Sequence, residues 1–594
     1  MNTGVPGFLG VERSATGRRW RARLDDDRAA LGLAQRLGVP EIVARVLAAR
    51  GVDAEAAPAF LEPRLREQLP DPAHLKDMDA AASRLARAVQ GGETIAVFGD
   101  YDVDGATSSA LLNRFFTAAG GRVRVYIPDR QREGYGPNAP ALLRLKAEGA
   151  AVVVTVDCGI TAHVPLASAA EAGLDVIVVD HHIAEPRLPL ATAVVNPNRL
   201  DETTPHRQLA AVGVTFLLAV AVNRKLREAG WYAARAEPAL LELLDLVALG
   251  TVCDVVPLTG LNRVFVTQGL KVLAQRRNEG LVALADAAHI QQRCDVYHLG
   301  FILGPRVNAG GRVGEADLGT RLLTTSDPEE ARVLAQRLDA YNRERQAIEA
   351  GVLEAATAQV ESAGGPRPFI FVAGEGWHPG VIGIVAGRLR ERYERPVFVV
   401  ALADGIGKGS GRSALGVDLG SAVIAAREAG LLINGGGHAN AAGLTVSAAR
   451  LGELQDFLAE RVTAQIVNST PSLAFDGALS LGAATTDLIT TLSRVGPFGV
   501  GNPEPRFAFP AVHVAKADIV GERHVRCFLA DQRGARLSAI AFRAVGSPLG
   551  EMLRDGTGLS LHLAGRLRAD EWQGQTRVQL QIEDAATISN NGPP

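Results

Sequence analysis

The sequence is poor in cysteine, in aromatic residues and in long apolar runs. Its four cysteines lie far apart and form no Cys-x-x-Cys pair, which argues against a disulfide framework and against a zinc knuckle. No segment reaches the roughly 18 consecutive apolar residues that a membrane span requires. The N-terminal segment also lacks the apolar core and the cleavage site of a signal peptide. We therefore expect a cytoplasmic protein without membrane association, whose thiols are reduced.

An excess of basic residues is also missing from the chain as a whole. The net charge is −3, which gives no general support to a nucleic-acid partner. Locally the balance changes, because residues 494–577 contain 11 arginines and one lysine against eight acidic residues, a net charge of +4. This favours a basic C-terminal module, although an ordinary solvated surface explains the same count equally well.

The 594 residues are too many for one core and predict three or four units of roughly 100–200 residues. From residue 94, apolar strand-like runs alternate with Ala/Leu-rich helices, which is typical of a parallel α/β sheet covered on both faces. From residue 472, short alternating strands predict a small β-barrel. We expect an N-terminal appendage (1–75), an α/β domain (76–315), a connecting helix (316–365), a second α/β domain (366–465) and the barrel (470–590).

Three alternate carboxylates, Asp100, Asp102 and Asp104, follow the first buried strand and precede a helix expected to begin near Ala106. Ligands of open α/β sheets bind at the carboxyl ends of the strands. Neighbouring carboxylates at such a place repel one another unless a cation compensates them. The plain alternatives are an exposed acidic turn or a helix cap. A calcium loop is disfavoured by the preceding strand and by the lack of the later glutamate.

Further acidic and imidazole side chains follow later segments of the same type. Asp157 ends the next apolar strand, His181 and His182 follow Asp180 at the end of a third, and Asp254 follows an apolar, helix-like run. A His-His pair alone is more often structural than metal-binding. If the sheet is parallel, however, all these side chains lie at one edge, where they predict a metal site.

Oxygen ligands suit hard divalent cations, and imidazole fits a site that uses Mn²⁺. Two adjacent ions stabilise the attacking and leaving oxygens of a phosphoryl displacement and lower the pKa of bound water. The sequence therefore predicts a two-metal phosphoesterase that needs no protein nucleophile.

The order D-Y-D-x-D-G, V-D-C-G, D-H-H and C-D resembles the DHH phosphoesterase family. Residues 374–400, 409–413 (GSGRS) and 435–443 (GGGHANAAG) resemble the accessory DHHA1 domain in its RecJ form. Residues 495–507, followed by short strands, resemble the entry into the oligonucleotide-binding (OB) fold that RecJ proteins carry. The resemblance extends from about residue 75 to the end of the chain.

The resemblance implies 5′-to-3′ hydrolysis of single-stranded DNA to mononucleotides with two Mn²⁺ or Mg²⁺ ions, in recombination and repair. It implies that single-stranded DNA is the substrate, and that a single-stranded-DNA-binding protein and a RecQ-type helicase are protein partners. The implied metal ligands are Asp100, Asp102, Asp104, Asp157, His181 and Asp254. Asp157 would bridge the ions and act in catalysis with His181 and His182, whereas Asp100 and His182 would bind the ions directly or support the other ligands.

One position departs from the family pattern. Some relatives carry a histidine ligand two residues before the first aspartate, where this chain has Phe98. One ion would then be held more weakly unless Asp100 takes that place.

Candidate substrate-binding residues combine guanidinium groups with small residues in turns. Guanidinium forks and exposed backbone amides suit a phosphate group, and glycines allow close approach of nucleic acid. The candidates are Arg306, Arg312, Ser410, Arg412, Gly436, Gly437 and His438. Alternatives are a domain interface for Arg306 and Arg312 and a plain turn for the glycines. Candidate base-stacking aromatics are Tyr135, Phe498, Phe507 and Trp572.

Two other functions stay open at this point. One is a phosphodiesterase or pyrophosphatase for short oligonucleotides or nucleotides, which would have no need of the C-terminal barrel. The other is a non-catalytic DNA-binding factor, which the intact Asp and His clusters disfavour.

Overall fold

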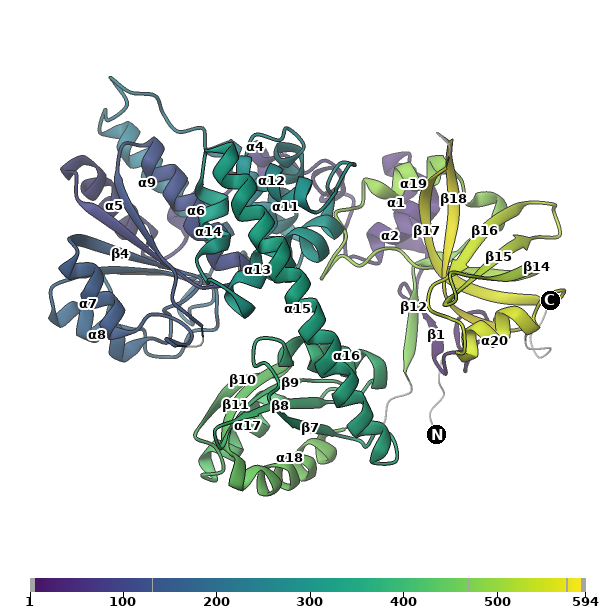
Figure 1. Cartoon of the computed structure of the whole chain (residues 1–594). Coiled ribbons are helices and arrows are strands. Elements are labelled where there is room, and N and C mark those ends of the chain that lie inside the picture. Colours follow the sequence, from purple (N-terminus) through teal and green to yellow (C-terminus); the bar gives the residue numbers. More distant parts are fainter. Residues whose placement is uncertain (1–5, 131, 467–470, 573–574, 589–594) are drawn as a thin grey trace. The chain divides into compact units, whose positions relative to one another are not determined.

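A computed structural model of the chain describes residues 6–130, 132–466, 471–572 and 575–588. The chain forms two compact units. The large unit comprises Asp71–Asp254 and Gly269–Ser469, and the small unit comprises Met1–Pro70, Val255–Gln268 and Thr470–Pro594. Figure 1 shows two α/β sheets in the large unit and a β-barrel in the small one.

The first part of the large unit is built on a five-stranded sheet in the order β3-β2-β4-β5-β6. All four neighbouring pairs are parallel, which confirms the predicted parallel sheet. The strands are β2 (Thr94–Gly99), β3 (Arg122–Tyr126), β4 (Ala150–Val156), β5 (Asp175–Val179) and β6 (Ala193–Val195). The residues of β2, β4, β5 and β6 are almost all buried because helices cover both faces of the sheet, whereas the edge strand β3 is partly to fully exposed.

The helices on the two faces come from different segments. Figure 1 shows α5 (Met78–Gly91), α6 (Val103–Ala118) and α9 (Ala211–Glu228) above the sheet, and α7 (Ala139–Ala147) and α8 (His163–Glu171) below it. Helix α6 begins three residues before the predicted start. Asp102 is its N-cap and accepts a hydrogen bond from the Gly105 amide (3.0 Å). Asp104 therefore lies in the first helical turn and not in a loop.

A helical segment follows this sheet. It consists of α10 (Leu244–Cys253), α11 (Gly260–Leu273), α12 (Glu279–Ala287), the π-helical turn η4 (His298–Leu303), α13 (Gly304–Val313), α14 (Leu318–Thr324) and α15 (Pro328–Ser362). Most of α11, up to Gln268, belongs to the small unit. The predicted long helix is α15, with Pro328 at its first position and the Asp327 side chain as its N-cap. In Figure 1, α15 leads from the first α/β part of the large unit to the second.

The second part contains a five-stranded sheet in the order β10-β11-β9-β8-β7, with only β7 and β8 parallel. Helices α15 and α16 share a core with one face, and α17 and α18 with the other. The elements are β7 (Ile370–Glu375), α16 (Ile382–Tyr393), β8 (Val397–Ala403), β9 (Ile406–Arg412), α17 (Leu419–Glu428), β10 (Asn434–His438), β11 (Ala441–Ser447) and α18 (Leu451–Gln465).

The small unit holds the predicted barrel, which closes because β14 pairs with both β15 and β17. Its strands are β14 (Phe507–Val520), β15 (His524–Ala530), β16 (Arg536–Ala541), β17 (Ser560–Trp572) and β18 (Gln575–Thr587), with α19 (Thr486–Ser493) and α20 (Pro548–Asp555) beside them. Thus the fold class expected from the sequence, α/β with two sheets and a C-terminal barrel, is confirmed.

The N-terminal residues, which the sequence left without a role, are part of the small unit. Strand β1 (Arg19–Ala22) pairs in parallel with β12 (Ser472–Phe475). Helices α1 (Arg28–Leu37) and α2 (Glu41–Ala48) contribute Leu33, Val43 and Leu47 to the core of the barrel.

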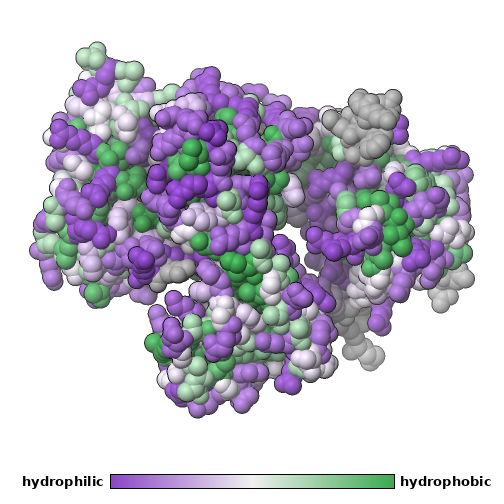
Figure 2. Space-filling model, in the orientation of Figure 1, coloured by the Kyte–Doolittle hydropathy of each residue, from purple (hydrophilic) through white to green (hydrophobic). Residues whose placement is uncertain are grey.

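A membrane span requires a long and continuously apolar helix. Within the residues described above, no helix combines enough length and apolarity to span a bilayer. Figure 2 shows that hydrophobic residues on the viewed face form small patches between hydrophilic ones.

Candidate active site

Side chains from four segments of the large unit meet at the carboxyl edge of the first sheet. Asp100 follows β2, Asp157 follows β4, His181 lies two residues after β5, and Asp254 follows α10. The His181 Nε2 atom lies 3.3 Å from Asp157 Oδ1 and 3.6 Å from Asp254 Oδ2. We call these side chains, together with Asp102, Asp104 and His182, the acidic cluster.

Four polar atoms of the acidic cluster are buried and, among the described residues, have no hydrogen-bond partner. They are Asp100 Oδ1, Asp157 Oδ1, His181 Nε2 and Asp254 Oδ2. Buried polar atoms are almost always paired, because an unpaired one costs free energy. Three carboxylate oxygens and an imidazole nitrogen left unpaired at one place indicate a cation-binding site.

The donor atoms fall into three groups that could each hold an ion. In each group the ligand atoms lie within 4.8 Å of one another. Asp157 belongs to two of the groups and His181 to two. The groups are Asp157-His181-His182, Asp104-His181-Asp254 and Asp100-Asp102-Asp157. A carboxylate shared between adjacent groups is what two neighbouring ions require.

Local backbone geometry brings these side chains to the sheet edge. Asp157 adopts a left-handed conformation (φ 61°), which few residues other than glycine tolerate and which bends the chain at the end of β4. The first turn of α6 passes so close to Asp100 that a Cβ atom on Gly105 would lie 2.4 Å from the Asp100 carbonyl oxygen. Glycine at 105 therefore allows the helix to begin directly beside the cluster.

Asp104 is also anchored by a helix N-terminus. Its two carboxylate oxygens accept hydrogen bonds from the Ala211 and Val212 amides at the start of α9 (2.7 and 2.8 Å). Its Oδ2 atom lies 3.9 Å from His181 Nε2, at the border of the cluster. Asp104 can thus fix α9 against α6 and still offer a lone pair to an ion.

The electrostatics of the cluster favour an added positive charge. Burial, followed by the charges of Asp102, Asp104, Asp100 and Asp254, raises the pKa of Asp157 well above its ordinary value. Burial and the charges of Asp104 and Asp102 raise the pKa of Asp254 to about 9. Burial and His182 lower the pKa of His181 to about 4, so its ring is neutral and able to bind a metal.

Asp180 has an orienting role that the sequence did not reveal. It is fully buried and accepts hydrogen bonds from the amides of Ile160, His181 and His182. Its carboxylate also lies 2.7 Å from His182 Nδ1. Although burial acts to raise it, the hydrogen bond and charge of His182 lower the pKa of Asp180 to about 2. The signal was its place directly before the His-His pair, since metal-binding histidines are commonly held by a carboxylate.

Two asparagines and a tyrosine complete the support of the cluster. The Asn196 and Asn198 side chains donate to the carbonyl oxygens of His182 and His181 (2.9 and 2.5 Å). The Tyr135 hydroxyl donates to the Asp157 carbonyl oxygen (3.0 Å) and lies 3.3 Å from His182 Nδ1. Tyr135, a candidate for base stacking, thus contacts the cluster directly through its hydroxyl.

Phe98 lies away from the acidic cluster. Its side chain is fully buried in the core between the sheet and α7, and its ring is 5.2 Å from that of Tyr126. The position at which some relatives place a histidine therefore contributes to the core in this chain, whereas Asp100 offers an unpaired oxygen to the cluster.

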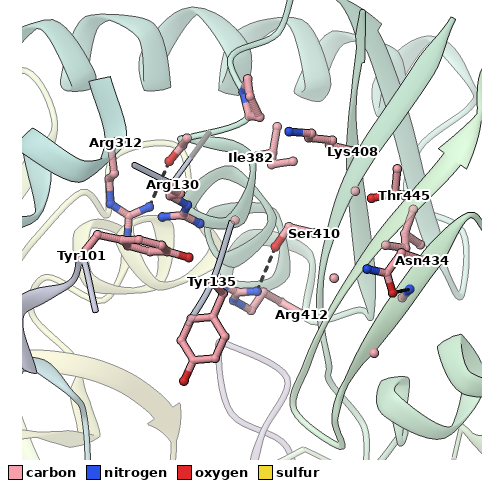
Figure 3. A pocket seen from close by; sticks show the side chains of 18 residues that line it. Tyr101, Arg130, Tyr135, Arg312, Ile382, Lys408, Ser410, Arg412, Asn434 and Thr445 are labelled. Carbon is pink, nitrogen blue, oxygen red and sulfur yellow. Dashed lines mark hydrogen bonds between the residues drawn. The ribbon is translucent and has the colours of Figure 1, made fainter. Parts of the chain in front are cut away.

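A pocket of about 500 Å³ lies beside the acidic cluster. Tyr101, which lies between Asp100 and Asp102 in the chain, lines it together with Tyr135. Figure 3 shows the side chains of Arg130, Arg312, Ser410 and Arg412 converging in it. We call these four residues the arginine pocket.

The arginines are held in place by the backbone and by Ser410. The Arg312 guanidinium donates to the Gly380 carbonyl oxygen (2.9 Å), and that of Arg412 donates to Ser410 Oγ (3.2 Å) and to the Gly411 carbonyl oxygen (2.8 Å). Burial, together with the charges of Arg130 and Arg345, lowers the pKa of Arg312 to about 10. Burial and neighbouring arginines also lower the pKa of Arg412. Crowded, partly buried guanidinium groups of this kind favour an anionic ligand such as a phosphate.

Arg130 is a pocket residue that sequence reasoning missed. It follows β3 in the same sheet, and its guanidinium lies 5.0 Å from the centre of the Tyr101 ring. Its position after a strand end was the available signal, since the other strand ends of this sheet had already been singled out.

The structure places the other candidate substrate residues differently. Arg306 pairs with Asp339 of α15 (3.0 Å) and donates to the Ile302 carbonyl oxygen, so it is not among the residues that line the pocket. Gly436 lines the pocket, whereas Gly437 (φ 151°) and the exposed His438 lie beyond its lining.

Three of the candidate stacking aromatics lie in the small unit. Phe507 is buried in the barrel core and is thus unavailable to a base, contrary to the prediction. Phe498 is half-buried against the same core. The side chain of Trp572 lies outside the described residues.

Comparison with family models gives three matches. Residues 94–251 match the DHH family N-terminal domain, residues 367–464 the DHHA1 domain, and residues 475–584 the RecJ OB domain.

Relatives and solved structures are similar to the chain over most of its length. It is 38% identical to the single-stranded-DNA-specific exonuclease RecJ of Dickeya dadantii, over 92% of this chain and 96% of the relative. It is 37% identical to the Escherichia coli protein of the same name, over the same two shares. A crystal structure of RecJ in complex with Mn²⁺ from Thermus thermophilus superposes with a TM-score of 0.80 at 30% identity, over 96% of this chain and 79% of that one. The corresponding Mg²⁺ complex gives a TM-score of 0.75 at 29% identity, over 95% and 77%. The chain therefore belongs to the RecJ family of single-stranded-DNA-specific exonucleases.

Proposed function

We propose that this chain is a metal-dependent exonuclease that hydrolyses single-stranded DNA at the acidic cluster. The observation that carries the proposal is the set of four buried donor atoms without partners, on Asp100, Asp157, His181 and Asp254. They lie next to an anion-favouring arginine pocket. A phosphodiesterase needs both features, one for metal ions and one for the phosphate backbone of its substrate.

The donor set suits Mn²⁺ or Mg²⁺. Carboxylate oxygens are preferred by both ions, and an imidazole adds affinity for Mn²⁺. Asp157 would be shared between two ions, His181 and Asp254 would bind on one side of it, and Asp100 and Asp102 on the other. Asp104 would remain at the border, where it also caps α9. The RecJ crystal structures similar to this chain contain Mn²⁺ or Mg²⁺.

Two such ions would lower the pKa of an attacking water and stabilise the negative charge that develops on the reacting phosphate. The protein supplies the orientation. Asp180 holds the His182 ring, Asn198 and Asn196 hold the backbone of the two histidines, and Tyr135 holds the backbone of Asp157. Since these hydrogen bonds already exist without a substrate, the reacting groups would need little rearrangement.

The arginine pocket would bind the 5′-terminal phosphate of the strand. Arg130 and Arg312 come from the first α/β part of the large unit, and Ser410 and Arg412 from the second. A strand end fixed there would leave the first internucleotide linkage at the cluster, because Tyr101 and Tyr135 line the pocket and adjoin the aspartates. This arrangement supports 5′-to-3′ removal of mononucleotides. Gly436 and Gly437, with His438 beyond them, would let the strand approach β10 closely.

The barrel would bind a further segment of the strand. On its surface, Arg526 lies over the ring of Phe528 (5.5 Å), which is 43% exposed, and Lys516 is the cross-strand neighbour of Phe528. Phe542, 54% exposed, contacts the ring of His524. Basic groups interleaved with exposed rings suit single-stranded nucleic acid.

We place this activity in DNA recombination and repair in the cytoplasm. An exonuclease restricted to single strands needs another protein to expose them, which supports a RecQ-type helicase and a single-stranded-DNA-binding protein as partners. Co-purification of each with the intact chain would test this part.

The central test uses single strands labelled at either end, incubated with Mn²⁺, Mg²⁺ or a chelator. We expect mononucleotides to be released from the 5′ end with either metal, and no release with the chelator. Release from the 3′ end would contradict the placement of the terminal phosphate. Release in the presence of chelator would contradict metal-dependent hydrolysis.

A further inference from the structure

Two exposed aromatic side chains of the large unit form a stack that the functional assignment above leaves unexplained. Tyr297 directly precedes the π-helical turn η4, and Phe301 lies within it. Their ring centroids are 5.4 Å apart and the rings are nearly parallel (27°). Tyr297 is 59% and Phe301 73% exposed. Rings are normally covered because they bury large apolar areas, so a stacked and exposed pair indicates a binding surface.

Hydrogen bonds around His298 fix the backbone that carries the stack. Residue His298, next to Tyr297, is buried, and its amide donates to the Asp295 carboxylate (3.1 Å). In return the Asp295 amide donates to His298 Nδ1 (3.2 Å), and Gln292 contacts the other ring nitrogen (3.1 Å). The π-helical turn that presents Phe301 is a rare local structure, found frequently at functional sites.

This turn packs against the segment that carries one of the candidate metal ligands. The Cys253 thiol donates to the Leu299 carbonyl oxygen (3.4 Å). A Cβ atom on Gly304, the residue after η4, would lie only 2.3 Å from the Cys253 sulfur. Cys253 directly precedes Asp254, whose carboxylate lies 3.6 Å from His181. The aromatic stack is therefore attached to the edge of the acidic cluster through the end of α10.

Phe301 also lines a second pocket, of about 420 Å³, between α13, α15 and α16. In Figure 1, α15 lies next to both α13 and α16. Arg312 lines both this pocket and the arginine pocket, so the two are adjacent. Arg345 and Arg388 add two further guanidinium groups.

The charge of this second pocket is suited to the phosphate groups of a nucleic-acid backbone. Glu349 pairs with Arg345 (2.7 Å) and lies 3.5 Å from Arg388, so it offsets one of the three positive charges. The Arg345 side chain is 9% exposed, and its Nε atom has no hydrogen-bond partner among the described residues. A pocket lined by three guanidinium groups and by one of two exposed, stacked rings has the basic and aromatic groups that bind single-stranded nucleic acid.

We propose that Tyr297 and Phe301 form a base-stacking platform for nucleotides on the 3′ side of the cleaved linkage, with Arg345 and Arg388 contacting the backbone phosphates. This inference rests on the proposed function, since it assumes that the strand end lies in the arginine pocket. The platform orients the strand as it reaches the cluster.

The experiment uses 5′-phosphorylated oligothymidylates with hydrolysis-resistant phosphorothioate linkages and a single 2-aminopurine at one of the first eight positions. The wild-type chain with Mg²⁺ should quench the fluorescence at one or two neighbouring positions, where the base stacks. The double variant Tyr297→Leu/Phe301→Leu keeps the apolar bulk without the rings. It should lose this quenching, and its dissociation constant for the strand should rise at least about tenfold.

Two controls separate stacking from general damage. Tyr297→Phe keeps the ring and should keep both the quenching and the affinity. Leu241→Ala, at another exposed apolar residue of the large unit, should leave both unchanged. An abasic site at the quenched position should weaken binding by the wild-type chain but cause no further loss in the double variant, because the same contact is already absent.

The outcomes are distinct. Absence of quenching at every position in the wild-type complex, or a double variant with unchanged affinity and quenching, would overturn the platform. Failure of the wild-type chain to bind or digest any 5′-phosphorylated single strand would overturn the proposed function itself.

Discussion

The acidic cluster and the arginine pocket are adjacent but are built in opposite ways. The cluster draws its aspartates and histidines from a single parallel sheet and the end of α10. The arginine pocket takes Arg130 from the loop after β3, Arg312 from α13, and Ser410 and Arg412 from β9 of the second sheet. In both, burial and like charges oppose the ionised state, so each favours a ligand of opposite charge. The comparison predicts that metal binding depends on one sheet, whereas recognition of the strand end would require both parts of the large unit.

The largest effect on the acidic cluster is expected from removing the carboxylate that the two candidate ion sites share. Asp157→Asn keeps the shape of the side chain but weakens the ligand between the two candidate ion sites. We expect hydrolysis of single-stranded DNA to fall by about a thousandfold or more, because both ions depend on this residue. Initial rates with saturating Mn²⁺ measure the effect.

Asp175→Asn is the matched control, since Asp175 begins β5 at the opposite end of the sheet and pairs with Arg84. Its activity should remain near that of the wild type. An active Asp157→Asn enzyme with a normal circular-dichroism spectrum would exclude Asp157 as the shared ligand.

The arginine pocket is tested by removing one guanidinium group. Arg412→Ala should raise the KM for a 5′-phosphorylated strand by about ten- to hundredfold, the usual loss for a hydrogen bond to a charged group. It should change the KM for a 5′-hydroxyl strand much less. Arg395→Ala, at an arginine outside the pocket lining, serves as control. An equal rise in KM for the 5′-phosphorylated and the 5′-hydroxyl strand would mean that the pocket does not bind the terminal phosphate.

The sequence was informative about the acidic cluster but not about the arginine pocket. Aspartates and histidines after buried strands could be read as a metal site because parallel strands end at a common edge. Arg130 was missed because nothing in the sequence shows that the loop after β3 faces residues some 280 positions later. Arg306 and Arg312 looked equivalent, yet six residues apart on α13 they point in different directions, one to Asp339 and the other into the pocket.

Similar limits apply to the aromatic residues and to the N-terminal segment. Phe507 is buried because it faces the barrel core together with Phe509, which depends on a register that the sequence does not reveal. The pairing of β1 with β12 joins residues more than 450 positions apart. The domain boundaries expected from the sequence stay predictions.

A smaller effect, on the binding of long strands, is expected from changes in the barrel. It would separate strand binding from hydrolysis. The double variant Arg526→Ala/Phe528→Leu should weaken binding of long single strands by about tenfold. It should leave the turnover of short oligonucleotides unchanged if these engage the large unit alone. Fluorescence anisotropy with strands of increasing length measures the difference, and Arg533→Ala in a barrel turn is the control. Equal losses for all lengths would count against a strand-holding role.

The smallest effect on activity is expected at Tyr135, which contacts the acidic cluster and lines the arginine pocket. Tyr135→Phe removes the hydroxyl that donates to the Asp157 carbonyl oxygen but keeps the ring in the pocket lining. One hydrogen bond contributes roughly 0.5–1.5 kcal/mol, so kcat should fall a few-fold while KM stays nearly constant. A large rise in KM with unchanged kcat would instead assign Tyr135 to substrate binding.

The central claim, that the acidic cluster holds two ions around Asp157, is tested most directly by titrating Mn²⁺ into the metal-free protein. Calorimetry and electron paramagnetic resonance on the wild-type chain should give two bound ions and the signal of a magnetically coupled pair. The Asp157→Asn variant should lose the coupled signal and at least one ion. A single uncoupled ion in the wild-type chain, or an unchanged coupled pair in the variant, would contradict the account.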